Sequence, residues 1–203
     1  LDLAATDYKG LYSFATCYNS EGAAELKGMM AAERDHLYVF NIKAIEKAVA
    51  DGKTIKVGDS EVPVVDARGP DGEIVIRVPL PKSPHGVNVD PTGKYAVVSG
   101  KLSPTVSVIE IDKLADAFAG KIKPRDCVVA EPEVGLGPLH TAYDNKGNAY
   151  TSIFLDSVVT KWNIAKAIEA YSKKAKEPNA VIEKIDVHHQ IGHINATMSE
   201  TKE

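Results

Sequence analysis

The feature that most constrains the fold of this 203-residue chain is an internal repeat. Three Asp-x-x-Gly signatures begin at Asp7, Asp90 and Asp144, and each is followed closely by a tyrosine and an apolar run. Asp at the first position and Gly at the last are typical of a type I turn, because the carboxylate can accept backbone N–H groups and glycine adopts the exit conformation. The second and third signatures are 54 residues apart. The sequence therefore predicts a turn that recurs between pairs of strands.

Each repeat unit has a second half in which an apolar strand runs into a short amphipathic helix. The strands are expected at residues 38–42, 106–111 and 158–164, and the helices at 43–49, 112–118 and 165–171. Apolar residues in these helices recur at the 3.6-residue period. The first two units are separated by a longer step, so the polar, Gly/Asp-rich segment 51–71 is expected to be an inserted loop or hairpin.

A unit of about 50 residues that combines strands with one short helix is typical of a β-propeller blade. We therefore expect an all-β fold with short helices, which is a partial β-propeller of about three blades plus the start of a fourth. Because a closed propeller needs at least four blades, the chain is expected to be a slice of a longer protein. The alternative is a plain α+β domain in which the similarity between units is accidental.

Composition excludes several classes of protein. Lys and Arg number 24 against 28 Asp and Glu, so no basic excess is available to neutralise the phosphates of a nucleic acid. No apolar run approaches ~18 residues, so no membrane span is expected. Two cysteines, Cys17 and Cys127, exclude a disulfide scaffold, and Cys17 is expected to be a buried small hydrophobe.

Three of the six histidines recur in phase with the repeat. His85 and His140 are 55 residues apart, and His193 follows 53 residues later. Equivalent positions of successive blades lie at the same height around the propeller axis, so three such imidazoles would converge on one point. Imidazole binds copper, zinc, iron or nickel, which favours a metal site. In the first unit the same phase holds Asp2, whose carboxylate could orient an imidazole.

The alternative for these histidines is that each lies near a turn as a surface or hydrogen-bonded residue. His36, His188 and His189 are out of phase; His188 and His189 could lie near the site, but they are expected to be structural.

A separate oxygen-rich segment lies early in the chain. Glu21 and Asp35, with backbone carbonyls between them, could bind a hard cation such as calcium, although the spacing fits no EF-hand loop. The alternative is a solvated acidic loop.

Five stretches together resemble the nitrous oxide reductase family. They are residues 14–21 (Phe-Ala-Thr-Cys-Tyr-Asn-Ser-Glu), 83–86 (Ser-Pro-His-Gly), 100–106 (Gly-Lys-Leu-Ser-Pro-Thr-Val), 137–142 (Gly-Pro-Leu-His-Thr-Ala) and 192–196 (Gly-His-Ile-Asn-Ala). The resemblance implies a periplasmic, head-to-tail homodimer whose subunits join a seven-bladed propeller to a cupredoxin domain. It also implies a tetranuclear copper–sulfide centre bound by seven histidines in the propeller, and a binuclear copper site in the cupredoxin.

Carried over by motif, the resemblance implies that His85, His140 and His193 are copper ligands, with His188 as the alternative to His193. Asp2 matches a carboxylate near the copper centre. Residues 1–203 would be part of the N-terminal propeller domain, and a signal peptide, the remaining blades and the cupredoxin domain would lie outside this chain.

The resemblance also implies a structural calcium. Tyr18, Glu21, Met29 and Asp35 match its ligands in order and spacing. The family commonly places an asparagine just before the Pro-His motif as a further ligand, and this sequence has Ser83 there.

The implied function is reduction of nitrous oxide to dinitrogen and water, the last step of denitrification. A small electron-donor protein of the c-type cytochrome or cupredoxin class would supply the electrons. The isolated fragment is expected to be inactive and poorly soluble. Two alternatives are a non-enzymatic propeller that binds partners through its loops, and a different propeller enzyme that uses a single Ca²⁺ or Zn²⁺ for hydrolysis. A hydrolytic enzyme of this kind would need several carboxylates in phase with the repeat, whereas the sequence has a single one, Asp2.

Overall fold

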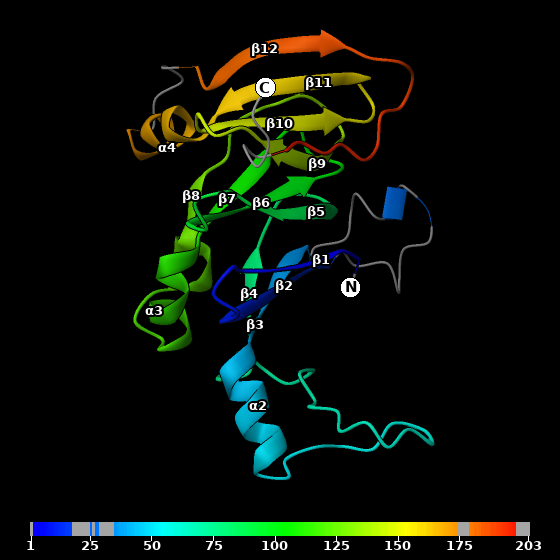
Figure 1. Cartoon of the computed structure of the whole chain (residues 1–203), viewed down its shortest axis with the longest axis vertical. Helices are drawn as coiled ribbons and strands as arrows, with labels where there is room; N and C mark the ends of the chain where they lie inside the picture. Colours follow the sequence, from blue (N-terminus) through cyan, green and yellow to red (C-terminus); the bar gives the residue numbers. More distant parts are fainter. Residues whose placement is uncertain (1, 18–24, 26, 29–34, 174–178, 198–203) are drawn as a thin grey trace.

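The structure, a computed structural model, describes residues 2–17, 25, 27–28, 35–173 and 179–197. Its strands form three four-stranded antiparallel sheets, each of consecutive strands. They are β1 (Ala4–Thr6), β2 (Tyr12–Cys17), β3 (His36–Asn41) and β4 (Val75–Pro79) in the first sheet; β5 (Pro84–Val89), β6 (Tyr95–Gly100), β7 (Val106–Glu110) and β8 (Val128–Ala130) in the second; and β9 (Pro138–Tyr143), β10 (Asn148–Ile153), β11 (Val158–Asn163) and β12 (Val181–Asp186) in the third. Figure 1 shows the sheets stacked one on another, which confirms the all-β, partial-propeller prediction.

A short helix follows the third strand of every sheet, as predicted. The helices are α2 (Ile42–Ala50), α3 (Leu114–Phe118) and α4 (Ile164–Ser172). In the second unit the first turn is a 3₁₀ helix, η1 (Ile111–Lys113), and a further one, η2 (Pro124–Cys127), precedes β8. Asn41 and Asn163 cap α2 and α4 in the same way, because each side chain accepts a backbone N–H three residues later.

Every sheet has a fourth, outer strand that the sequence reading did not include. β4, β8 and β12 come after the helix and pair with the third strand of their own sheet. No strand of a fourth sheet lies within residues 187–197, so the start of the fourth unit adds no strand to the described part of the chain.

The predicted Asp-x-x-Gly turns are present. Gly10, Gly93 and Gly147 all have positive φ, the conformation for which glycine is favoured. The Asp90 carboxylate accepts the N–H groups of Lys94 and Tyr95 at 3.0 and 2.8 Å. Asp7 and Asp144 accept equivalent N–H groups. Each turn is thus built around one aspartate.

Apolar side chains fill the two spaces between neighbouring sheets. One cluster joins the first and second sheets and includes Phe14, Leu37, Val78 and Val98. The other joins the second and third sheets and includes Val97, Val108, Tyr143, Ile153 and Trp162. Because successive residues of a strand point to opposite faces, Val97 and Val98 of β6 belong to different clusters.

The insertion between α2 and β4 is a loop with a single isolated bridge between Ile55 and Val64, as predicted for residues 51–71. One prediction about cysteine was wrong. Cys17, at the end of β2, is only half-buried, whereas Cys127 is fully buried, and neither of the two forms a disulfide. Among the described residues, no helix has the length and apolarity to cross a bilayer.

Candidate metal centre

The first strands of the three sheets, β1, β5 and β9, carry or adjoin the candidate residues, and we call them the inner strands. β5 contacts both β1 and β9. Asp2 lies two residues before β1, His85 is the second residue of β5, and His140 is the third residue of β9. Because each residue is near the beginning of its strand, the three side chains meet at the same end of the inner strands.

The structure brings all three in-phase histidines together with Asp2. The ring centroids of His85 and His140 are 5.1 Å apart with their planes at 69°, and those of His140 and His193 are 4.2 Å apart at 23°. Nδ1 of His85 lies 2.6 Å from Oδ2 of Asp2. The four side chains form a row, Asp2–His85–His140–His193, which we call the histidine row.

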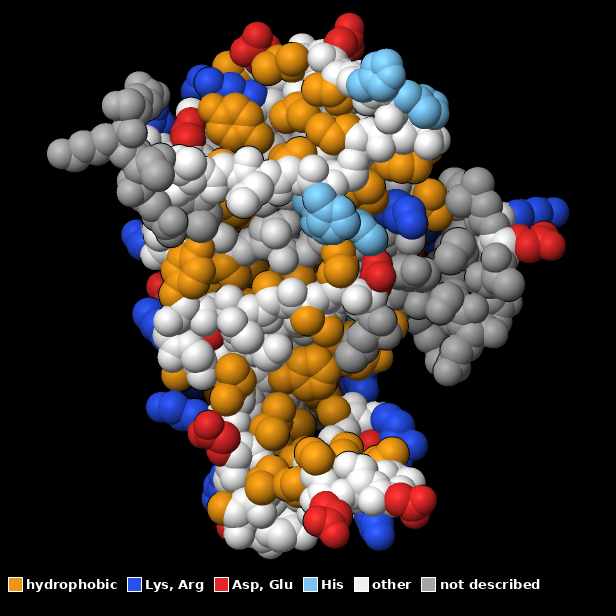
Figure 2. All heavy atoms as spheres, turned by 45° about the vertical axis from the view of Figure 1, so that its right-hand side comes forward, with side chains coloured by type: hydrophobic (Ala, Val, Ile, Leu, Met, Phe, Trp, Pro, Cys, Tyr) orange, Lys and Arg blue, Asp and Glu red, His pale blue; other side chains and the backbone are white. Residues whose placement is uncertain are grey.

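Residues 187–197, after β12, bring His193 to the row. His188 and His189 are exposed. Figure 2 shows histidine side chains gathered at two separate places on one face of the molecule. The ring contact to His140 is made by His193, which favours His193 over His188 as the third member.

The middle of the row holds a neutral imidazole. Burial, followed by the charges of His193 and His85, lowers the pKa of His140 to about 4, against the opposing effect of Asp2. Its Nε2 is buried and has no hydrogen-bond partner among the described residues. A neutral imidazole with an unpartnered buried nitrogen is what a metal ion requires of a histidine ligand.

The row is not arranged around one ion. Within the described ranges, no three His, Cys, Asp or Glu side chains are placed to hold a single metal ion. The His85 and His140 rings meet edge to face, and the His140 and His193 rings are stacked.

Two small residues that the sequence reading did not single out fix the backbone of the row. A Cβ added to Gly86 would lie 2.0 Å from the backbone oxygen of Leu139, so only glycine lets β5 approach β9 this closely. The hydroxyl of Ser152 accepts the N–H of His140 at 3.2 Å and lies 3.4 Å from its carbonyl oxygen. Gly86 does lie next to a candidate ligand in the sequence, whereas Ser152 has no distinguishing signal.

Of the residues expected to bind calcium, Tyr18, Glu21 and Met29 lie outside the described residues. Asp35 is buried just before β3, and its Oδ1 has no hydrogen-bond partner in the part of the chain that the structure describes. Burial raises the pKa of Asp35, although the backbone N–H of Ser83 and the charges of Lys82 and His36 oppose this. Asp35 and Ser83, 48 residues apart in the sequence, are therefore in contact.

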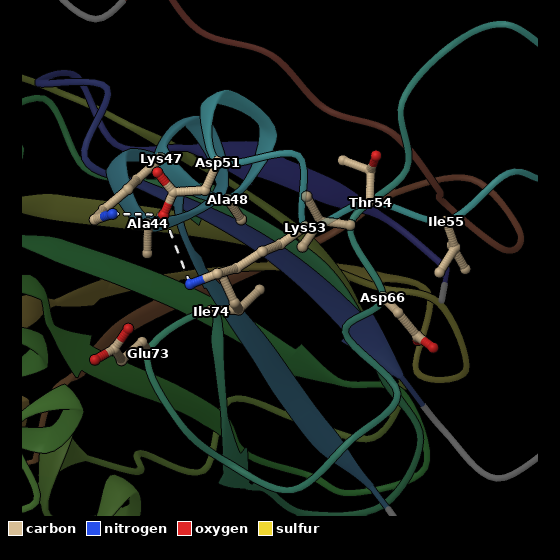
Figure 3. Close-up of a pocket in the computed structure, with 11 residues that line it drawn as sticks. Ala44, Lys47, Ala48, Asp51, Lys53, Thr54, Ile55, Asp66, Glu73 and Ile74 are labelled. Carbon is tan, nitrogen blue, oxygen red and sulfur yellow. Dashed lines mark hydrogen bonds and ion pairs between the residues drawn. The ribbon is translucent and has the colours of Figure 1, made fainter.

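A second concave site lies between α2 and the insertion, with a volume of about 400 Å³ (Figure 3). Both of its lysines are paired with one carboxylate, since Asp51 lies 2.6 Å from Lys47 and 3.6 Å from Lys53. Neither histidine nor cysteine lines it, so it is not a candidate for a copper centre.

Solved structures similar to this chain show its fold. The β-propeller domain of Cps50 (Swd1) from Myceliophteria thermophila matches 97% of this chain with 47% of its own length, at a TM-score of 0.53 and 7% identity. Hydrazine synthase from Kuenenia stuttgartiensis matches 92% of the chain with 50% of its own, at a TM-score of 0.52 and 12% identity.

No family model matches the chain, but named proteins are similar to it in sequence. Nitrous-oxide reductase from Stutzerimonas stutzeri is 53% identical over 207 aligned residues, which cover 100% of this chain and 32% of the relative. The nitrous-oxide reductase of Ralstonia nicotianae is 48% identical over 98% of the chain and 32% of the relative. The chain is thus related along its whole length to the nitrous-oxide reductases, and it spans about a third of theirs.

Proposed function

We propose that this chain is part of a reductase that converts nitrous oxide to dinitrogen and water at a tetranuclear copper–sulfide centre, the last step of denitrification. His85, His140 and His193 would bind copper. The observation that carries this proposal is the histidine row, in which residues from three repeat units meet in ring contact. Relatives that match the whole chain are named nitrous-oxide reductases, which supports the same chemistry.

The residues of the row have distinct tasks in this proposal. When bound, copper supplies the electron transfer that organic side chains cannot perform. Asp2 accepts the Nδ1 proton of His85, which fixes the tautomer and leaves Nε2 free to bind metal. His140 is neutral, so it needs no deprotonation before it binds. The inner strands hold these ligands on a rigid frame.

A calcium site beside the row is part of the proposal, with Tyr18, Glu21, Met29 and Asp35 as ligands. The supporting observation is the buried, unpartnered Oδ1 of Asp35, because a carboxylate oxygen removed from water needs a cation or a donor. Calcium would hold the segment between β2 and β3 in place. Chelation of calcium from the complete protein should lower its thermal stability, and an unchanged melting temperature together with unchanged electron transfer contradicts this role.

The wider setting is proposed on the strength of the relatives. Residues 1–203 would be one part of the N-terminal propeller domain of a periplasmic homodimer. A cupredoxin domain elsewhere in the polypeptide would carry a binuclear copper site and receive electrons from a small c-type cytochrome or cupredoxin. The third of the relatives' length that this chain spans would therefore contribute some of the copper ligands and not the whole centre.

The experiment that tests the function is metal analysis of the complete protein, purified without air and assayed for copper and acid-labile sulfide. The proposal predicts both, and absence of both overturns it in favour of a non-enzymatic propeller. Single substitutions His85→Ala, His140→Ala and His193→Ala should each lower the copper content. The matched control is His188→Ala, which should retain it because the ring contact to His140 is made by His193 and not by His188. Loss of copper in His188→Ala but not in His193→Ala would reverse the choice of third ligand.

A further inference from the structure

Thr16 is a buried polar residue that links two elements of the histidine row. It lies in β2 and is fully buried. Its hydroxyl donates a hydrogen bond of 2.7 Å to the carbonyl oxygen of His85, in the neighbouring sheet. One side chain thus connects the first sheet directly to the backbone of a proposed copper ligand.

Thr16 also shapes the backbone around Asp2, through its own backbone and through its hydroxyl. Both Asp2 and Leu3 face Thr16: the N–H of Asp2 donates to the Thr16 carbonyl at 2.8 Å, and the N–H of Leu3 donates to the Thr16 hydroxyl at 3.1 Å. The N–H of Thr16 donates in return to the Leu3 carbonyl at 2.9 Å. Two residues opposite one are the arrangement of a β-bulge, a device that re-aims a side chain.

We infer that Thr16 is a positioning residue for the proposed copper centre, which holds Asp2 and His85 in register so that the carboxylate of Asp2 meets Nδ1 of His85. The inference rests on the proposed function. Thr16 touches neither the imidazole nor a metal. It acts because its hydroxyl donates its proton to the His85 carbonyl and accepts the N–H of Leu3. Removing the hydroxyl takes away the bond to His85 and the bond from Leu3, the neighbour of Asp2, and so loosens the frame of the 2.6 Å contact between Asp2 and His85.

The chain offers a matched control in Thr160. This residue is also fully buried, lies in β11, and donates a hydrogen bond of 2.7 Å to a backbone carbonyl, that of Val134. Its hydrogen bond does not involve the histidine row. Thr16→Val and Thr160→Val therefore remove the same kind of bond, and only the first touches the row.

The test compares these variants in the complete, copper-loaded protein. The readouts are copper and sulfide content, the visible and electron paramagnetic resonance spectra, and the rate of copper loss to excess bathocuproine disulfonate. Thr16→Val should lose copper about 10-fold faster or more, the range found when the partner of a ligating histidine is removed, and its spectra should shift. Thr16→Ser, which keeps the hydroxyl, should restore the wild-type values. Thr160→Val should lose thermal stability while its spectra stay unchanged.

The outcomes separate this inference from the proposed function. A wild-type protein without copper and sulfide overturns both. Normal copper in the wild type and loss in His85→Ala, together with a Thr16→Val variant that behaves like Thr160→Val, overturns the inference alone. If Thr16→Val yields no folded protein, Thr16→Ala is compared with Thr16→Ser instead. The smaller alanine side chain leaves room for a water molecule that can bind the freed backbone groups. A folded Thr16→Ala variant with wild-type spectra and copper retention likewise overturns the inference.

Discussion

Gly86 sets how closely the inner strands of the second and third sheets can approach. An added Cβ would lie 2.0 Å from the backbone oxygen of Leu139 and 3.1 Å from Nδ1 of His140. Backbone cannot turn aside as a flexible side chain can, so β5 and β9 must separate. We expect Gly86→Ala to lower the free energy of unfolding by about 3 kcal/mol, the upper end of the usual cost of overpacking. It should also lower the copper content, because His85 moves away from His140.

Urea unfolding of the complete protein measures this change. Gly72→Ala is the control, because Gly72 has open space around its Cβ position and no positive φ. A Gly86→Ala variant as stable as Gly72→Ala would show that the strands do not need this close approach.

Cys127 is a thiol whose chemistry is set by burial. It is fully buried, and desolvation raises its pKa to about 11. The thiolate is the reactive species, so Cys127 stays protonated and unreactive between pH 7 and 9 in the native protein. Iodoacetamide should label Cys127 only after unfolding, and peptide mass spectrometry measures the extent of this labelling. Because the folded pKa is raised, its contribution to stability is complete below the unfolded pKa and is lost as pH rises towards 11. Rapid native labelling at neutral pH would contradict this description.

At the level of elements, the Asp-x-x-Gly turns are the recurring local device. Asp90 is buried, and its carboxylate accepts three backbone N–H groups and the hydroxyl of Thr92. Asp90→Ala leaves those donors without a partner, which should lower the free energy of unfolding by about 2–4 kcal/mol. Asp112→Ala is the control, because its carboxylate is 72% exposed and makes only a 3.9 Å ion pair with Lys9. Equal melting temperatures of the two variants would contradict the description of Asp90 as the residue that stabilises the turn.

Local elements could be predicted from the sequence because their causes are local. Turns need one aspartate and one glycine at fixed spacing, and the helices that begin at Ile42 and Ile164 need a capping asparagine and an apolar face. The outer strands could not be placed in the same way. β8 has only three residues and β12 is largely exposed, so neither offers the longer run of alternating buried residues that would predict a strand.

In the candidate centre, the residues that could be predicted are those that recur in phase with the repeat. The phase of His85, His140 and His193 implies that they meet, because equal positions in successive units lie at equal height. Thr16 has no such phase, and a threonine in a strand is ordinary. Its role depends on contact with His85, 69 positions away, which only the packing of two sheets creates. The sequence also does not distinguish the buried His140 from the exposed His193.

On the scale of the whole molecule, the three sheets form a stack in which the second sheet packs against both of the others. The second sheet lies between the other two and contributes to both apolar clusters. Polar contacts near the inner strands add to this packing, since the hydroxyl of Tyr143 donates to the carbonyl of Asn88 at 2.6 Å, and the side chain of Asn88 accepts the N–H of Thr141. In such stacks, the free energy of unfolding is approximately the sum of the contributions of each sheet and of each interface between neighbouring sheets.

Val97 and Val98 allow the two sheet interfaces to be weakened separately. Both are buried in β6, but Val97 packs against the third sheet and Val98 against the first. Each Val→Ala change should lower the free energy of unfolding by about 2 kcal/mol, from lost burial and a residual cavity. Hydrogen exchange in the complete protein should separate them, because unfolding free energies differ locally. Val97→Ala should speed exchange in β9–β12 more than in β1–β4, and Val98→Ala should do the reverse. The same exchange pattern in both variants would mean that the sheets open as one unit, so that no interface between neighbours can be weakened alone.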